Sequence, residues 1–213
     1  NYFKAVVGLP VLAYKNNKDT FREKLLENKV YNLKLNGIEK TIVIEDIIVF
    51  PEGAGAYFNI QNRAKNAIVI DIGGGTTNIV SFKNGKLDKY TTIAKGMIEL
   101  YNRIRECLNS EYTLKLELED IENLMKEGLK VDGKEVNWSF VKPIINDLVN
   151  ELMNELRNFE IRTSTVYLTG GGSKLLRAAL RNKVPGLVLV EDYLFSNAKG
   201  FKNVGVAKWK ERE

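Results

Sequence analysis

Residue types that can bind phosphate are concentrated in one short stretch, residues 68–82, which reads IVIDIGGGTTNIVSF. An apolar run contains the carboxylate of Asp71, and three glycines and two threonines separate it from a second apolar run. Consecutive glycines let a backbone approach a ligand closely and aim several N–H groups into one space, and a carboxylate beside them can hold a hydrated cation. The stretch therefore predicts a strand–turn–strand cradle for a polyphosphate with Mg²⁺. The alternative is a glycine-rich hairpin without a ligand.

Two other stretches contain residues suited to the same chemistry, PEGAGAY at 51–57 and TGGGS at 169–173. Glu52 follows a proline near an expected helix start, where it either complements the helix dipole or faces a cleft and orients a water. The second stretch joins a predicted strand to a predicted helix, so its backbone could approach a flat or anionic ligand. A tight turn without a ligand is the alternative, and the glycine spacing is not that of the dinucleotide fingerprint.

Residues 128–134 space their glycines and lysine as a phosphate-binding P-loop does. The next residue is Glu135, so the hydroxyl that would bind magnesium is missing, and no strand precedes the stretch. Asp132-Gly133 instead predicts a hairpin turn between two short strands. We therefore reject the P-loop interpretation.

The composition excludes several kinds of site. The 213 residues include no histidine and a single cysteine, Cys107, so histidine-dependent catalysis and histidine metal sites are ruled out and a disulfide framework is impossible. Basic residues are scattered among acidic ones, which disfavours direct contact with nucleic acid. No apolar run is long enough to span a membrane. We expect a cytoplasmic protein with no membrane contact and no direct nucleic-acid contact.

The stretches that could bind a ligand are set in a chain that alternates predicted strands and helices. Ala5–Pro10 reads as the end of a buried strand, and Asn36-Gly37 and Asn84-Gly85 predict hairpin turns. The apolar spacing predicts helices at 17–28, 97–108, 117–128, 139–157, 174–181 and 196–208. This pattern indicates an α/β protein.

The order of the motifs is more specific than any one of them. The segments FPEGAGAYF, VIDIGGGTTNIVSF, VYLTGGGSKLL and NAKGFKNVG follow one another as the connecting segment, second phosphate motif, adenosine motif and C-terminal crossing helix do in one superfamily. The chain thus resembles the superfamily of actins, heat-shock chaperone ATPases and sugar kinases, and is most similar to the ParM/StbA-like bacterial actins. The resemblance implies an α/β, actin-like ATPase (ribonuclease H-like) fold, with a complete second domain and a remnant of the first.

The resemblance also implies a division of the chain. It comprises a remnant of subdomain IA at 1–50, a connecting helix at 51–66, the first part of subdomain IIA at 67–110, a small subdomain IIB at 111–138, the second part of IIA at 139–198 and a C-terminal crossing helix at 199–213.

By the same resemblance, the bound ligand is ATP or GTP with Mg²⁺. Asp71 would hold the Mg²⁺ through water, and Glu52 would be the catalytic residue that orients the attacking water. The β- and γ-phosphates would bind at Gly73, Gly74, Gly75, Thr76 and Thr77. The adenine and α-phosphate would lie beside Gly170, Gly171, Gly172 and Ser173.

Three further residues are assigned more loosely. Glu122 and Lys126 lie one helical turn apart, so they can face one side of a helix. The resemblance implies that this helix contacts the ribose, and the alternative is an ordinary solvent-exposed salt bridge. Gly96 is expected near the base.

One motif of the superfamily has no counterpart. The first phosphate motif is a D-x-G hairpin near the N-terminus, and nothing in residues 1–30 supplies it. We therefore expect roughly the first third of an actin-like fold to be absent. The full-length form would be a nucleoside-triphosphate hydrolase, and this chain alone a poor or inactive ATPase.

The function implied is an actin-like protein that polymerises head to tail into filaments and segregates plasmid DNA, with nucleotide hydrolysis controlling filament stability. Its partners would be further copies of itself and a DNA-binding adaptor protein at a centromere-like site. One alternative is a small-molecule kinase or activator ATPase of the same superfamily. Another is a non-catalytic fragment.

Overall fold

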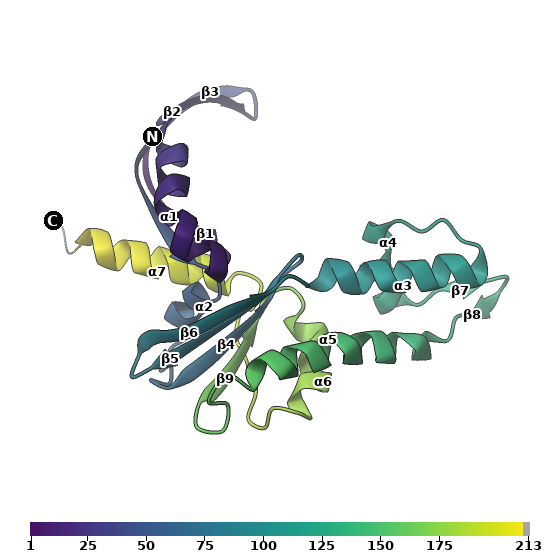
Figure 1. The fold of residues 1–213 in the computed structure, drawn as a ribbon. Helices are drawn as coiled ribbons and strands as arrows, with labels where there is room; N and C mark the ends of the chain where they lie inside the picture. The colour runs from purple at the N-terminus through teal and green to yellow at the C-terminus, as the bar shows by residue number, and fades with distance from the viewer. Residues whose placement is uncertain (211–213) are drawn as a thin grey trace.

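A computed structural model describes residues 1–210 of the chain. It contains a five-stranded sheet, a smaller three-stranded sheet and a long helical arm (Figure 1). No helix in this part of the chain is long and apolar enough to cross a membrane.

The five-stranded sheet has the strand order β10-β9-β4-β5-β6. Its strands are β4 (Ala67–Ile72), β5 (Thr77–Lys83), β6 (Lys86–Ile93), β9 (Thr165–Thr169) and β10 (Val188–Leu189). Strands β4, β9 and β10 are parallel, whereas β5 and β6 continue from β4 as an antiparallel meander. All six residues of β4 are buried, as expected of a central strand covered on both faces.

Alternating residues of β4 feed two separate cores. Ile68, Ile70 and Ile72 pack with α3 (Met97–Tyr112), α5 (Val141–Leu156) and α6 (Ser173–Arg181). Ala67 and Val69 lie in a second core with α2 (Ala54–Asn59), and α2 packs against α7 (Ser196–Lys210). The two-residue period of a strand therefore places helices on both faces of the sheet.

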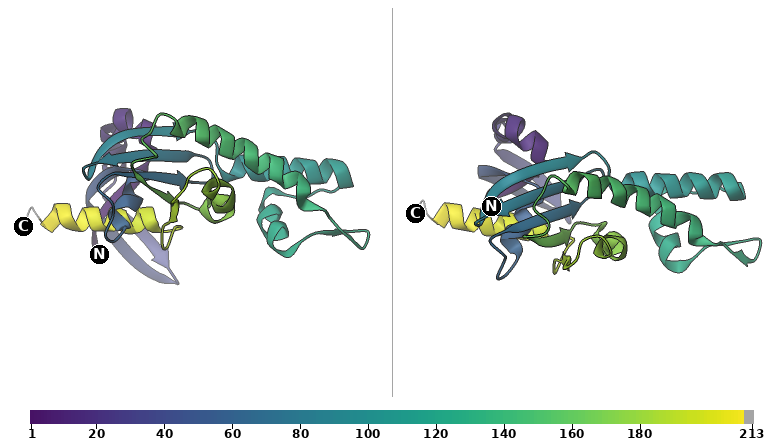
Figure 2. Two further views of the ribbon diagram at one scale, coloured as in Figure 1. Left: turned by 90° about the horizontal axis from the view of Figure 1, so that it is seen from below. Right: turned by 60° about the horizontal axis from the view of Figure 1, so that its bottom comes forward.

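The arm is formed by α3 and α5, which extend beyond the sheet (Figures 1 and 2). At its far end lie α4 (Leu118–Glu127), β7 (Lys130–Val131), β8 (Lys134–Glu135) and the short 3₁₀ helix η1 (Trp138–Phe140). Strands β7 and β8 pair antiparallel around Asp132-Gly133. This confirms the predicted hairpin and the rejection of a P-loop there.

The smaller sheet has the order β1-β3-β2 and contains β1 (Tyr2–Leu9), β2 (Val30–Leu35) and β3 (Ile38–Pro51). The prediction that the first strand is buried was wrong, because β1 lies at a sheet edge and its residues are exposed or half-buried. The first helix also starts earlier than predicted, since α1 (Val11–Leu26) begins directly after Pro10. Val11 is fully buried, which holds this first turn in place.

Two of the expected boundaries fall inside α-helices. The division at 110/111 lies within α3, and the division at 198/199 lies within α7. Both helices run on because their apolar faces stay packed, with Leu108 of α3 and Phe201 of α7 buried.

Candidate functional site

The two glycine motifs start side by side. Asp71 of β4 pairs with Thr169 of β9 in the parallel register, so the loops that follow both strands leave the same edge of the sheet. Gly170 has φ +88°, and a Cβ atom built on it would lie 2.5 Å from Oδ1 of Asp71. Only glycine fits at this contact. The structure thus brings the two predicted glycine loops together at Asp71.

The first glycine loop is held by the start of α3. The N–H groups of Met97 and Ile98 donate to the carbonyls of Gly73 (3.0 Å) and Gly74 (2.9 Å). A Cβ atom on Gly96 would lie 2.5 Å from both of these carbonyl oxygens. Gly96 therefore lies against the loop, and the carbonyls of the loop point toward α3.

With these carbonyls engaged, several N–H groups remain open to solvent. Within residues 1–210, the N–H groups of Gly74, Gly75, Thr76 and Gly171 donate no hydrogen bond. Gly74, Gly75 and Gly171 are also exposed. Unpaired N–H groups on glycine-rich turns are suited to anions, so this edge of the sheet can accept a phosphate chain.

Two of the predicted ligand hydroxyls are already engaged. Thr77 is buried and its Oγ1 donates to the carbonyl of Lys95 over 2.9 Å. Ser173 is fully buried and its Oγ donates to the carbonyl of Gly170 over 2.7 Å. Both hydroxyls stabilise the turns in this arrangement, which leaves the backbone N–H groups and the hydroxyl of Thr76, which makes no hydrogen bond within residues 1–210, as the donors.

Asp71 is the most strongly perturbed acid described. Its side chain is 6% exposed, and burial raises its pKa to about 6, with the nearby charge of Glu52 adding to the rise. The amide of Asn197 opposes the shift, since Nδ2 donates to Oδ2 of Asp71 over 2.8 Å. Oδ1 of Asn197 in turn accepts hydrogen bonds from the N–H groups of Gly53 and Ala56, each at 3.0 Å. Asn197 therefore ties Asp71 to the segment that contains Glu52.

Glu52 lies next to Asn78, the residue that follows Thr77 on β5. Nδ2 of Asn78 donates to Oε2 of Glu52 over 3.3 Å, and its Oδ1 accepts from Oγ1 of Thr92 over 2.8 Å. Partial burial raises the pKa of Glu52 above its ordinary value, although the Asn78 bond opposes this. The carboxylate thus faces the Asp71 site and is oriented by a buried amide.

The donor set fits a hydrated Mg²⁺ ion. Two desolvated carboxylates, Asp71 and Glu52, lie close enough for the charge of one to raise the pKa of the other, which a cation would relieve. Within residues 1–210 no group of three or more acidic or cysteine side chains could enclose a metal ion. Mg²⁺ is commonly held by one or two carboxylates together with water and substrate phosphates, and this site offers that arrangement.

Asn78 and Asn197 were missed by the sequence analysis. Each had a weak signal, because an asparagine in the apolar run of β5 and another in the first turn of α7 both stand where a polar side chain needs a buried partner. Nothing in the sequence indicated that these partners would be Glu52 and Asp71.

Glu122 and Lys126 lie on α4 and form an ion pair with each other at 2.6 Å, with both side chains exposed. The structure does not bring them into contact with the glycine loops. They do share a face of α4 with Met125, which lines a cavity of about 530 Å³ between α4, α5 and α6. Leu175, two residues beyond Ser173, lines the same cavity.

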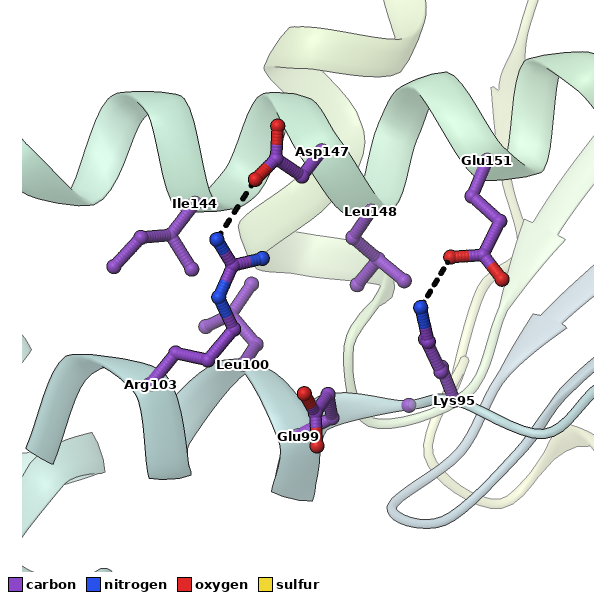
Figure 3. A pocket seen from close by; sticks show the side chains of 9 residues that line it. Lys95, Glu99, Leu100, Arg103, Ile144, Asp147, Leu148 and Glu151 are labelled. Atoms are coloured by element: carbon purple, nitrogen blue, oxygen red, sulfur yellow. Dashed lines mark hydrogen bonds and ion pairs between the residues drawn. The ribbon is translucent and has the colours of Figure 1, made fainter. Parts of the chain in front are cut away.

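Two ion pairs join α3 and the loop that precedes it to α5 beside the site (Figure 3). Lys95 reaches Glu151 at 2.9 Å and Arg103 reaches Asp147 at 2.7 Å. The hydrogen bond with Glu151 raises the pKa of Lys95. The cavity between these pairs holds about 40 Å³, room for a few water molecules only, so it is a junction of two helices rather than a ligand site.

Comparison with protein families matched two parts of the chain. Residues 69–182, more than half of the 213, match the family described as archaeal actin homologue MreB-like, C-terminal. Residues 2–55 match the family described as actin like proteins N terminal domain. A comparison with curated proteins found no match.

Solved structures of actin homologues share the fold. The archaeal actin homologue Ta0583 in complex with ADP has 22% identity and a TM-score of 0.79, covering 96% of this chain and 73% of that one. A non-polymerisable quadruple mutant of pCBH ParM has 23% identity and a TM-score of 0.79, with coverages of 95% and 67%. ParM in a 15-stranded filament from Clostridium botulinum has 22% identity and a TM-score of 0.78, with coverages of 95% and 66%. These likenesses confirm the predicted actin-like α/β fold.

Proposed function

The chain belongs to the family of MreB-like archaeal actin homologues, and from this we propose that it binds a nucleoside triphosphate with Mg²⁺ and assembles head to tail into filaments. The nucleotide binds across the two glycine loops, and hydrolysis lowers the stability of the filament. The cargo is plasmid DNA, reached in the cytoplasm through a DNA-binding adaptor protein at a centromere-like site.

The observation that carries this proposal is the pairing of open N–H groups with a buried carboxylate. The N–H groups of Gly74, Gly75, Thr76 and Gly171 are unpaired within residues 1–210 and flank Asp71. Burying a carboxylate without a strong partner is unfavourable, and among residues 1–210 the amide of Asn197 is the one donor to the Asp71 side chain. A cation bound together with a phosphate chain would compensate the buried negative charge of Asp71.

Each carboxylate has a distinct role in this proposal. Asp71 would hold a bound Mg²⁺ ion through water, and the ion would supply charge neutralisation for the phosphates. Glu52 is more exposed to solvent than Asp71, and the hydrogen bond from Asn78 orients its carboxylate. In this position the carboxylate would accept a hydrogen bond from the attacking water. The N–H groups of the first loop position the β- and γ-phosphates.

The nucleoside part is assigned to the side of the second loop. The cavity between α4, α5 and α6 has a volume suited to a small molecule and is bounded by Leu175 and by the Met125 face of α4. Glu122 and Lys126 share that face and would approach the ribose. The proposal covers both ATP and GTP.

The filament proposal is supported by relatives of the same fold, since the Clostridium botulinum ParM and a protein described as Alp12 were solved as filaments. A direct test is sedimentation and electron microscopy of the 213-residue chain with Mg²⁺ and ATP, GTP, ADP or a slowly hydrolysed analogue. We expect pelleted filaments with the triphosphate or its analogue and fewer with ADP.

The matched variants for this test are Asp71→Asn and Asp88→Asn. Asp88 is an exposed carboxylate on β6 of the same sheet, so its loss controls for charge. Filaments that form equally well without nucleotide, or with Asp71→Asn, would contradict the role of the site. Complete absence of nucleotide binding in a calorimetric titration would contradict the proposal as a whole.

A further inference from the structure

We propose that duplex DNA binds through its phosphates to a basic edge of the five-stranded sheet, at the strand ends opposite the two glycine loops. This surface, called the basic edge, comprises residues 61–66, 83–86, 157–164 and 181–187. The contact does not require a nucleotide. It adds a direct, sequence-independent interaction to the contact made through the adaptor protein.

The sheet topology gathers the four segments of the basic edge. Strands β4, β9 and β10 are parallel, so the segments that precede them lie at one edge of the sheet. Strand β5 runs antiparallel to β4, which places the β5–β6 turn at the same edge, toward the lower left of the sheet in Figure 1. Two hydrogen bonds link neighbouring loops, from the N–H of Gly85 to the carbonyl of Lys65 (2.8 Å) and from the N–H of Thr165 to the carbonyl of Asn66 (3.1 Å). Basic residues that are scattered along the sequence therefore share one surface.

The basic edge carries eight basic side chains and one acidic side chain, a net charge of +7, whereas the whole chain carries +5. Each of the four segments contributes two of the basic residues, and all eight are exposed. The acidic residue, Glu160, is paired with Lys83 at 3.7 Å. The other seven basic residues form no ion pair within residues 1–210. A surface of unpaired cations attracts an anionic partner and is stabilised by it.

The cations of the basic edge are arranged in a row. The segments follow the strand order β10-β9-β4-β5-β6, and neighbouring strands lie about 4.8 Å apart, so the row is about 19 Å long. Duplex DNA carries a phosphate about every 3.4 Å along each strand, so a duplex lying along the row presents about five phosphates on its near strand. A linear polyanion therefore fits this surface better than a compact anion does.

The other side chains of the basic edge favour a duplex over an acidic protein segment. Phe159, Val184 and Leu187 are buried, and no large apolar side chain in the four segments is exposed. Protein interfaces depend on apolar and aromatic anchors, and single-stranded nucleic acid needs exposed rings for stacking. The segments instead contain five exposed asparagines, and amides, like cations, donate hydrogen bonds to phosphates. This composition is that of a surface for a nucleic-acid backbone.

The basic edge is separate from the candidate nucleotide site. Asn66 and Asp71 lie at opposite ends of β4, and the five residue steps between them span about 17 Å. The Debye length at physiological ionic strength is about 8 Å, so charges at the two sites are largely screened from each other. We therefore expect DNA affinity to be the same with and without Mg²⁺-ADP.

The test is fluorescence anisotropy of a short labelled DNA duplex titrated with the 213-residue chain, without nucleotide, at several salt concentrations. With about five phosphates in contact, the logarithm of the association constant should fall against the logarithm of the salt concentration with a slope of about −4 to −5. Duplexes rich in A·T pairs and in G·C pairs should bind within about threefold of each other, because phosphate contacts carry no sequence information.

The test variant is Lys65→Ala with Arg162→Ala, which removes one cation before β4 and one before the neighbouring strand β9. We expect its association constant to fall about tenfold or more and its salt slope to become shallower by about 2. The charge-retaining variant Lys65→Arg with Arg162→Lys should bind within about threefold of the wild type.

The control is Lys15→Ala with Lys24→Ala, which replaces two exposed lysines of α1. It changes the charge by the same amount on the helix that packs against β3 of the smaller sheet, so DNA binding should be unchanged. Circular dichroism checks that every variant is folded, and binding by the charge-retaining variant shows that the two positions tolerate substitution.

Three outcomes would overturn the inference. The first is a wild-type chain that shows no salt-dependent binding to the duplex. The second is an alanine variant of the basic edge that binds as the wild type does, or an α1 control that loses as much affinity. The third is displacement of the duplex by polyglutamate at equal charge concentration, which would assign the surface to an acidic protein segment. Each of these leaves the proposed function standing, because nucleotide binding and filament assembly are measured separately and without DNA.

Discussion

Asn197 donates a hydrogen bond from Nδ2 to Oδ2 of Asp71 over 2.8 Å, although 126 positions separate the two residues in the chain. The other atom of the same amide accepts from the N–H groups of Gly53 and Ala56. One side chain on α7 therefore joins the end of β4 to the start of α2. The candidate magnesium-binding carboxylate, Asp71, and the segment that contains the candidate catalytic residue, Glu52, are thus held by one amide.

Replacing Asn197 by alanine should lower the free energy of unfolding by about 2–3 kcal/mol, because it leaves a buried carboxylate and two N–H groups without partners. Chemical denaturation measures this. Asn203→Ala on the same helix is the control, since it removes one hydrogen bond from an exposed amide to the carbonyl of Phe58. If the two substitutions lowered the free energy of unfolding equally, the hydrogen bonds of Asn197 would contribute no more to stability than the single bond of Asn203.

Asp71→Asn should stabilise the fold above pH 6 and abolish Mg²⁺-dependent nucleotide binding. The pKa of Asp71 is about 6 in the folded chain, above the ordinary aspartate value, so the folded state retains a proton that the unfolded state loses between about pH 4 and pH 6. The stability of the wild type therefore falls as pH rises through this window.

The gap in unfolding free energy between Asp71→Asn and wild type should accordingly widen by about 2–3 kcal/mol from pH 4 to pH 7. Thermal unfolding across pH, with ADP titrations with and without Mg²⁺, measures both effects. The control Asp88→Asn leaves Asp71 in place, so it should retain the wild-type pH dependence. A gap that stays constant with pH would contradict the buried, proton-retaining state of Asp71.

Gly75→Ala should leave the fold intact and weaken phosphate binding. A Cβ atom on Gly75 meets no other atom within 4 Å, so we expect a change in unfolding free energy of about 0.5 kcal/mol or less. The new methyl group would occupy space beside the open N–H groups and lower the affinity for Mg²⁺-ADP about tenfold or more. Calorimetric titration checks this.

Gly96→Ala provides the contrast to Gly75→Ala. Its Cβ atom would lie 2.5 Å from the carbonyl oxygens of Gly73 and Gly74, so stability and binding should fall together. Unchanged ADP affinity in a folded Gly75→Ala chain would show that phosphate does not approach this loop.

Glu52→Gln should slow hydrolysis with little change in binding. A glutamine keeps an oxygen that can accept the hydrogen bond from Asn78, but it cannot act as a base toward water. We expect the single-turnover rate of ATP or GTP cleavage to fall about 10²-fold or more, with Mg²⁺-ADP affinity within twofold of the wild type. A rate that stays at the wild-type level would assign water orientation to another residue.

Several features of the fold could be predicted from local sequence. The glycine hairpin after Asp71, the turn at Asp132-Gly133 and the apolar spacing of α5 each depend on neighbouring residues, and each is present in the structure. The order of the motifs was enough to predict an actin-like fold. The edge position of β1 was not predictable in this way, because the partners of a strand are set by distant segments.

The sequence by itself determined which residues could form a phosphate cradle, because glycine turns, strand ends and hydroxyl positions are properties of short segments. The tertiary structure alone decided how they are used. It turned the hydroxyl of Thr77 inward onto the carbonyl of Lys95, left the N–H groups of the loops open, and placed Asn197 against Asp71. Hydrogen bonds between residues more than a hundred positions apart form only when sheet register and helix packing bring them together, and no local pattern encodes that distance.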